Sequence, residues 1–70
     1  MNNTEFPELV NQMTIRGEKL KDIVNLLNFK HLSQASRRLS GKIEWTIKEI
    51  EALCEHYNMN FEKLFVRKED

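Results

Sequence analysis

Apolar residues along this chain recur every three or four positions, which is the spacing of one face of an α-helix. We predict a first helix over about residues 4–14, with Thr4 as its cap and Pro7 in its first turn, where the missing N–H costs nothing. Gly17 then interrupts the pattern and marks a turn. A second helix is expected over residues 18–27. Its apolar stripe has i, i+3, i+4, i+7 spacing and consists of Leu20, Ile23, Val24 and Leu27.

The same period continues in the second half of the chain. A third helix is predicted over residues 31–40, and a short fifth helix over residues 61–65. The fourth helix has the clearest start, because Thr46 and Glu49 have the spacing of a capping box, and it ends at Asn58. The inward-facing residues expected on the third and fourth helices are Leu32, Ala35, Leu39, Ile47, Ile50, Leu53, Cys54 and Tyr57.

No segment shows the alternating pattern of a strand, so the expected fold class is all-α, a compact bundle of four to five short helices. Seventy residues make one small domain, which we place at residues 1–65, followed by a charged, flexible tail at residues 66–70. Hydrophobic residues at 40% and charged residues at 31% fit a folded domain. The single cysteine, Cys54, excludes an internal disulfide. Helix packing or self-association must therefore stabilise the fold.

The sequence lacks the residues that several classes of function require. One cysteine and two histidines give no metal framework, and no set of acid, base and nucleophile can be assembled. We therefore expect neither an enzyme nor a bound cofactor. The N-terminus lacks the pattern of a signal peptide, and no apolar run has the length of a membrane span. The expected location is the cytoplasm of a bacterial host cell.

Charge is unevenly distributed along the chain. Eleven basic residues balance eleven acidic ones, so the net charge is zero, which argues against indiscriminate nucleic-acid binding. Residues 14–42, however, hold seven basic and two acidic residues, a local charge of +5, and residues 31–42 hold no acid. Residues 43–60 carry −3, from four acidic residues and one basic residue. The basic centre suits docking onto phosphates.

The same basic centre contains two short predicted helices joined by a tight turn at Asn28. Residues 18–41 therefore have the organisation of a helix-turn-helix unit, whose second helix enters the DNA major groove. Because Gln can bond adenine and Arg can bond guanine through two contacts, we expect base reading by Gln34, Arg37 and Arg38. Phosphate contacts are expected from Lys19, Lys30, Ser33, Ser36, Lys42 and Thr46. A basic helix face is usually only a solvated face, but here it coincides with the turn and with base-reading side chains.

Over about residues 16–65, the order of residues resembles the phage repressor and Cro-type helix-turn-helix family. Residues 35–42 (ASRRLSGK) mirror that family's recognition-helix ending, and residues 41–50 are similar to the link and fourth helix of phage regulators. Asn28 stands where the family has Gly, and the spacing from Phe29 to Ala35 is one residue longer. The resemblance implies a lambda-repressor-like fold and a transcriptional regulator, a repressor of Cro type, which binds double-stranded operator DNA as a homodimer.

A second function from another class remains open. An antirepressor or other protein-interaction module could keep the helix-turn-helix fold and bind a phage repressor protein, because neutral net charge and an acidic fourth helix suit a protein partner. Four apolar residues bear on this question. They either close the core or form a dimer or partner contact, and they are Trp45, Phe61, Leu64 and Phe65.

Overall fold

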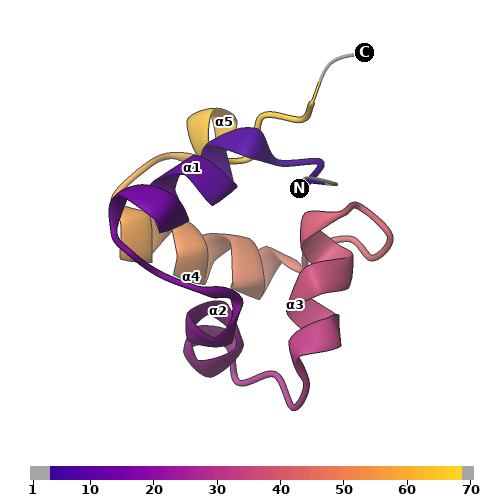
Figure 1. Ribbon diagram of the computed structural model, residues 1–70. Helices are drawn as coiled ribbons and strands as arrows, with labels where there is room; N and C mark the ends of the chain where they lie inside the picture. Colours follow the sequence, from indigo (N-terminus) through magenta and orange to yellow (C-terminus); the bar gives the residue numbers. More distant parts are fainter. Residues whose placement is uncertain (1–3, 69–70) are drawn as a thin grey trace.

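The computed structural model describes residues 4–68 and contains five α-helices in that range. These are α1 (Pro7–Ile15), α2 (Leu20–Leu27), α3 (Leu32–Leu39), α4 (Ile47–Tyr57) and α5 (Phe61–Leu64). No strand occurs within these residues, so the prediction of an all-α bundle is confirmed. Figure 1 shows α4 crossing the middle of the bundle, with α1 and α5 above it, α2 below it and α3 beside its first turn.

The ends of α2 and α4 follow the local signals in the sequence. The hydroxyl of Thr46 accepts the Glu49 N–H at 3.2 Å, and the Glu49 carboxylate accepts the Thr46 N–H at 3.0 Å, which is the predicted capping box. Asn28 and Asn58 end α2 and α4 in the left-handed conformation, with φ of 59° and 56°. Asn tolerates this conformation better than most residues. Both turns therefore need a residue of this kind.

The N-terminal segment differs from the prediction. α1 begins at Pro7, whose fixed φ suits the first helical position, and Thr4 does not cap it. Instead, the Thr4 hydroxyl accepts the Phe6 N–H at 3.0 Å and donates to the carbonyl of Leu39 at 3.2 Å. The Glu5 N–H donates to the same carbonyl at 2.7 Å. Thr4 and Glu5 are thus hydrogen bonded to the last residue of α3.

The helix pair that forms the centre of the sequence motif also begins later than predicted. α2 starts at Leu20 and α3 at Leu32, one or two residues inside the expected ranges. At α2 the reason is local, because the Asp22 carboxylate accepts the N–H of Lys19 at 2.7 Å and fixes Lys19 as the residue before the helix.

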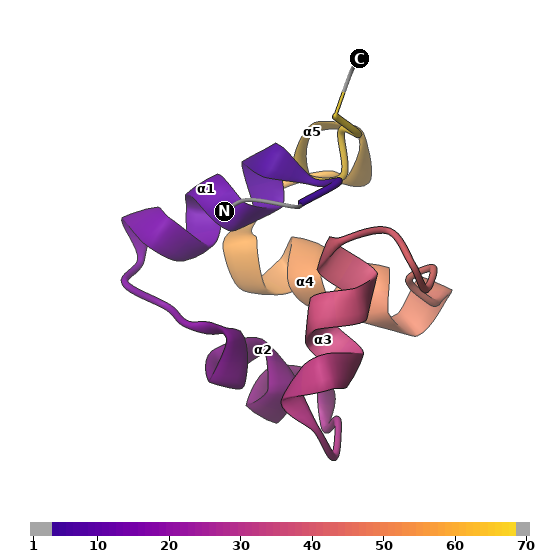
Figure 2. The ribbon, with the colours of Figure 1, turned by 45° about the vertical axis from the view of Figure 1, so that its right-hand side comes forward.

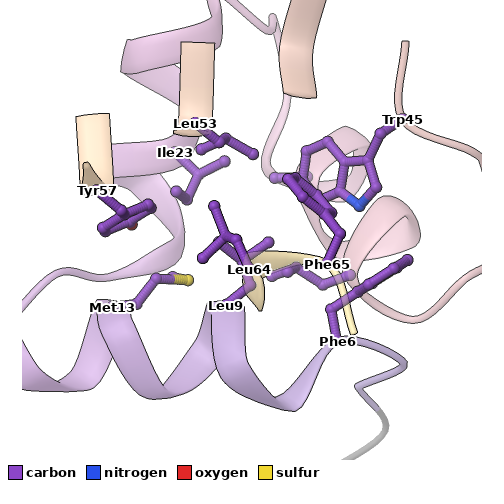
Figure 3. Close-up of a cluster of buried hydrophobic side chains, with 11 residues drawn as sticks. Phe6, Leu9, Met13, Ile23, Trp45, Leu53, Tyr57, Leu64 and Phe65 are labelled. Atoms are coloured by element: carbon purple, nitrogen blue, oxygen red, sulfur yellow. The ribbon is translucent and has the colours of Figure 1, made fainter. Parts of the chain in front are cut away.

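One hydrophobic core joins all five helices. Leu9 of α1, Leu53 of α4 and Leu64 of α5 are fully buried, and Ile23 of α2 and Ala35 of α3 pack with them. Figure 3 shows Leu9, Ile23, Leu53 and Leu64 converging, with the aromatic side chains of Phe6, Trp45 and Phe65 beside them. The buried set is Phe6, Leu9, Met13, Ile23, Ala35, Leu39, Trp45, Leu53, Tyr57, Leu64 and Phe65. Without a disulfide, this shared core holds the short helices together.

Burial in this chain distinguishes between the two roles, core closure and a dimer or partner contact, that the sequence left open for four apolar residues. Trp45, Leu64 and Phe65 are 9%, 0% and 7% exposed, so they close the core. Phe6, Trp45 and Phe65 meet edge to face, with ring centroids 5.7–6.4 Å apart, the arrangement that aromatic quadrupoles favour. Phe61 differs from them, because it is 53% exposed while it stacks on Phe65.

Two residues predicted to face inward are exposed. Leu32 and Ile47 retain 53% and 75% of their accessible surface. Each is the first residue of its helix, so it projects beyond the turns that neighbouring helices cover. The period of apolar residues places them on the correct face, but it does not show where the neighbouring helix ends.

The described part of the predicted tail is attached to the domain. The N–H of Lys68 donates to the carbonyl of Glu5 at 2.8 Å. The Arg67 guanidinium lies 5.3 Å from the centre of the Phe6 ring, and its Nη1 lies 3.7 Å from the Glu5 carboxylate. Arg67 and Lys68 are therefore held next to Glu5 and Phe6, and residues 69–70 lie outside the described range.

Candidate nucleic-acid interface

α2 and α3 pack directly against each other, and the four residues from Asn28 to His31 connect them. In Figures 1 and 2 the two helices lie side by side, with their connecting turn at one end of the molecule. The turn begins at the left-handed Asn28, and the N–H of Phe29 closes it on the carbonyl of Val24 at 2.9 Å. Phe29 is half-buried against the core. The motif predicted from the sequence thus has its two helices and its tight turn.

The outward face of α3 is polar and basic. Ala35 and Leu39 are buried, and Arg37 stands two residues from each, which in a helix of 3.6 residues per turn is the opposite side. Ser33, Ser36 and Arg37 are exposed. α3 contains no acidic residue. Of the three predicted base readers, Arg37 has the position that such a role needs.

Arg38 lies in different surroundings from Arg37. Its Nε donates to Glu49 at 2.9 Å, its Nη1 donates to the carbonyl of Gln34 at 3.0 Å, and its guanidinium stacks on Phe29 at 4.4 Å. The side chains of Arg38 and Glu49 are each only 14% exposed. The Arg38 guanidinium, which the sequence predicted to read bases, therefore contacts other parts of the protein. It connects α3 to Phe29 in the turn and to Glu49 in α4.

The side-chain oxygen of Gln34 is already used in a hydrogen bond within the protein. Its Oε1 accepts the N–H of Lys30 at 2.9 Å, which satisfies a backbone donor just before α3. Two-contact reading of adenine uses both the oxygen and the nitrogen of the amide. Gln34 must release Lys30 before it can make that pair of bonds.

The predicted phosphate contacts fall into two groups. The exposed group surrounds α2 and α3 and comprises Lys19, Lys30, Ser33, Ser36 and Lys42. Thr46 is also exposed, but its hydroxyl and its own N–H are both bonded to Glu49 within the capping box. The Glu49 carboxylate beside Thr46 opposes a phosphate there, so the local role of Thr46 is that of a helix cap.

A groove of about 710 Å³ lies between α3 and the N-terminal segment. It brings together several of the residues that the sequence predicted separately. Ser33, Ser36, Arg37 and Lys42 all line it, and Lys68 joins them from the other end of the chain. Sequence reasoning did not assign Lys68, because nothing in the sequence shows that the chain end returns to α3.

The two acidic residues of the basic centre are engaged within the protein. Glu18 accepts a hydrogen bond from the Tyr57 hydroxyl at 2.5 Å and lies 2.7 Å from Nε2 of His56. Burial raises the pKa of Glu18. The hydrogen bonds from Tyr57 and His56, together with the charges of His56 and Arg16, outweigh the effect of burial and lower this pKa. Burial and the neighbouring Glu18 carboxylate raise the pKa of Tyr57. Asp22 bonds the Lys19 N–H. Both carboxylates are therefore held in place by hydrogen bonds within the protein.

Other kinds of site are not visible in the described residues. Within residues 4–68, no group of three or more His, Cys, Asp or Glu side chains is placed to hold a metal ion. Burial raises the pKa of the half-buried Cys54 thiol, which disfavours the reactive thiolate. In the same range no helix is long and apolar enough to cross a membrane.

Comparison with known proteins places this chain in a family. No curated protein and no solved structure matches the chain significantly. The family model of the BetR domain matches residues 4–70, which includes every helix described above. The match is to that domain and not specifically to a Cro or repressor family. The chain therefore belongs to the BetR domain family, a small helical domain found in phage and bacterial regulators.

Proposed function

We propose that this chain is a sequence-specific DNA-binding transcriptional regulator of phage repressor type, with α3 in the major groove. One observation carries the proposal. The outward face of α3 combines exposed Arg37 with exposed Ser33 and Ser36, and no acid lies on that helix. A major groove about 12 Å wide admits a helix, and an Arg fork on guanine is the commonest specific contact. Arg37 is therefore the main base reader.

Three exposed lysines supply the phosphate contacts around α3. Lys19 stands before α2, Lys30 lies in the turn, and Lys42 follows α3. In a helix-turn-helix the first helix crosses the phosphate backbone, so cations at these ends of α2 and α3 meet phosphates on both sides of the groove. Ser33 and Ser36 add short hydroxyl donors.

Gln34 and Arg38 take different parts in this proposal. Arg38 is a positioning residue, because its guanidinium is held by Glu49 and Phe29 and sets the placement of α3. Gln34 reads adenine only after its hydrogen bond with the Lys30 N–H breaks and is replaced by hydrogen bonds to the base. The base preference at the centre of the site is therefore assigned to Arg37.

A homodimer on a two-fold symmetric operator completes the proposal. A single small domain with zero net charge has little non-specific attraction to DNA, and two linked domains read two half-sites with combined affinity. Of the four apolar residues that either close the core or form a dimer contact, Phe61 keeps an exposed ring. It is our candidate for the contact.

Selection from randomised double-stranded DNA tests this function. The wild-type chain is expected to enrich one motif, and Arg37→Ala is expected to lose about 1–3 kcal/mol of discrimination at one base pair. Lys63→Ala, on α5, serves as the exposed basic control and should keep the wild-type motif. Enrichment of no motif by the wild-type chain, or an unchanged motif with Arg37→Ala, contradicts the proposal.

Exposed apolar side chains favour a second candidate function, that of an antirepressor. Ile47 and Phe61 are 75% and 53% exposed, and the acidic residues Glu51 and Glu55 are exposed on α4. An apolar surface with acidic neighbours suits a protein partner such as a phage repressor. Mixing this chain with a repressor already bound to its operator tests the idea. A salt-resistant complex of the two proteins that releases the DNA supports the antirepressor, whereas an undisturbed repressor–operator complex contradicts it.

A further inference from the structure

We propose that the groove beside α3 holds the phosphate backbone of one DNA strand, and that Lys68 is a phosphate-binding residue in it. This inference rests on the proposed function, because it requires α3 to lie on DNA. It adds a binding surface formed by the chain end, which neither the helix-turn-helix motif nor the family match assigns. For brevity we call this surface the α3 groove.

The α3 groove has a volume of about 710 Å³, and its polar lining comes from two main walls, while apolar Val10, Leu20 and Leu39 also line it. One wall is a face of α3, where Ser33, Ser36, Arg37 and Ser40 follow the i, i+3, i+4, i+7 spacing. The other wall is the N-terminal segment at Thr4 and Glu5, which hydrogen bonds to Leu39 hold against the end of α3. The groove is thus built from parts that are fixed to one another.

Cations from three separate segments meet in the groove. Arg37 comes from α3, Lys42 from the loop after it, and Lys68 from the chain end. Among the described lining residues Glu5 is the one carboxylate, and Arg67 lies 3.7 Å from it. Because Glu5 has this cation of its own, the three cations of the groove are left in excess. An anion with several oxygens is the ligand that this lining fits.

The backbone of Lys68 is fixed in place before any ligand binds. Its N–H donates to the carbonyl of Glu5 at 2.8 Å, and the preceding Arg67 stacks on the buried Phe6 at 5.3 Å. A cation carried on an ordered backbone loses less entropy when it binds than one on a free chain end. Lys68 is therefore a better phosphate ligand than its position near the end of the sequence suggests.

Arg37 connects the groove to the DNA surface. It lines the α3 groove and is also exposed on the side of α3 opposite its buried residues, so the groove opens beside the face that meets base edges. When a helix lies in the major groove, the phosphates of the two strands flank it on either side. This continuity favours a DNA strand over an acidic peptide as the occupant.

The salt dependence of DNA binding tests the inference. The full chain is titrated with the DNA motif that it selects, at salt concentrations between about 50 and 200 mM. Lys68→Gln is expected to lower affinity at every sequence alike and to make the slope of log K against log salt shallower by about 0.9, the loss of one phosphate contact. Lys42→Gln should do the same, and the two changes together should add. Lys63→Gln, which lines other surface hollows beside α5, should leave the slope unchanged.

The outcomes separate this inference from the proposed function. If the wild-type chain binds its motif while Lys68→Gln and Lys63→Gln share the wild-type slope, the α3 groove does not hold phosphate, and the role of α3 stands. If the wild-type chain binds no DNA, the proposed function itself fails. Binding of a polyglutamate peptide that depends on Lys68, in the absence of DNA binding, overturns the inference and assigns the groove to an acidic protein.

Discussion

Nε of Arg38 lies 2.9 Å from Oε1 of Glu49, and this ion pair joins α3 to the start of α4. The same Glu49 oxygen accepts the N–H of Thr46 at 3.0 Å, so a single carboxylate both caps α4 and anchors α3. Both side chains are largely buried, and Phe29 covers the guanidinium. Such a pair is less screened by solvent than an exposed one, and leaving one partner unpaired is costly.

The first prediction concerns this pair. Arg38→Ala should destabilise the fold by about 1–3 kcal/mol, because it leaves the Glu49 carboxylate part-buried without its cation. DNA affinity should fall with stability, while the preferred base sequence stays the same. Urea unfolding and motif selection measure the two effects. Arg37→Ala is the matched control and should show the opposite result, with unchanged stability and a changed motif.

A double-mutant cycle completes that test. Arg38→Ala, Glu49→Gln and the double variant should give a coupling energy within the range of about 0.5–3 kcal/mol that residues in direct contact show. Additive effects of the two changes would mean that Arg38 and Glu49 do not stabilise each other. A new base preference in Arg38→Ala would mean that Arg38 contacts DNA.

Acid pH should weaken the contact between the loop after α1 and the end of α4. Glu18 is held by Tyr57 and His56, and its folded-state pKa is lowered from the ordinary value of 4.5. A lowered pKa contributes stability above the unfolded pKa, and this contribution is lost as pH falls through the folded pKa. Wild type and Glu18→Gln should therefore differ most above pH 4.5 and converge below it.

Urea titrations at a series of pH values measure this difference. Glu62→Gln, at an exposed position of α5, is the control and should follow the wild-type curve across the range. A gap between wild type and Glu18→Gln that stays constant into acid would show that the Glu18 charge is not what these hydrogen bonds stabilise.

Core packing gives a prediction with a control on the same helix. Leu53 and Ile47 both lie on α4, but Leu53 is fully buried and Ile47 is 75% exposed. Leu53→Ala should cost about 2–5 kcal/mol, because it removes buried methyl groups and leaves a cavity at the centre of the core. Ile47→Ala should change stability by no more than about 0.5 kcal/mol. Thermal unfolding followed by circular dichroism distinguishes them, and equal losses would contradict the assignment of the core.

Local signals in the sequence were sufficient for part of this structure. The capping box of Thr46 and Glu49 and the helix end at Asn58 depend on residues within a few positions, and they are found as predicted. The burial of a helix start depends on neighbours far along the chain. For this reason the period of apolar residues placed Ile47 in the core, although its side chain is exposed.

In the candidate site, too, the surroundings of a residue depend on contacts with residues far along the chain. Arg37 and Arg38 are adjacent and chemically identical, so nothing in the sequence distinguishes their roles. Their difference arises because Glu49, eleven residues after Arg38, folds back beside α3. Lys68 could not be assigned to the site for the same reason, since its position depends on a hydrogen bond to Glu5 at the other end of the chain.

Phe61 provides the last prediction, which tests the proposed homodimer. Its ring is 53% exposed at the edge of the aromatic group, where it stacks on Phe65 at 5.6 Å. If two chains pair through this ring, Phe61→Ser should weaken the dimer at least tenfold, which corresponds to about 1.4 kcal/mol. Ile15→Ser is the control, because Ile15 is an exposed apolar residue on a different helix. Sedimentation equilibrium over a range of concentrations should show a wild-type dimer, an Ile15→Ser dimer and a largely monomeric Phe61→Ser. A wild-type chain that stays monomeric off DNA and on its selected motif would remove both the dimer and the two-fold operator from the proposal.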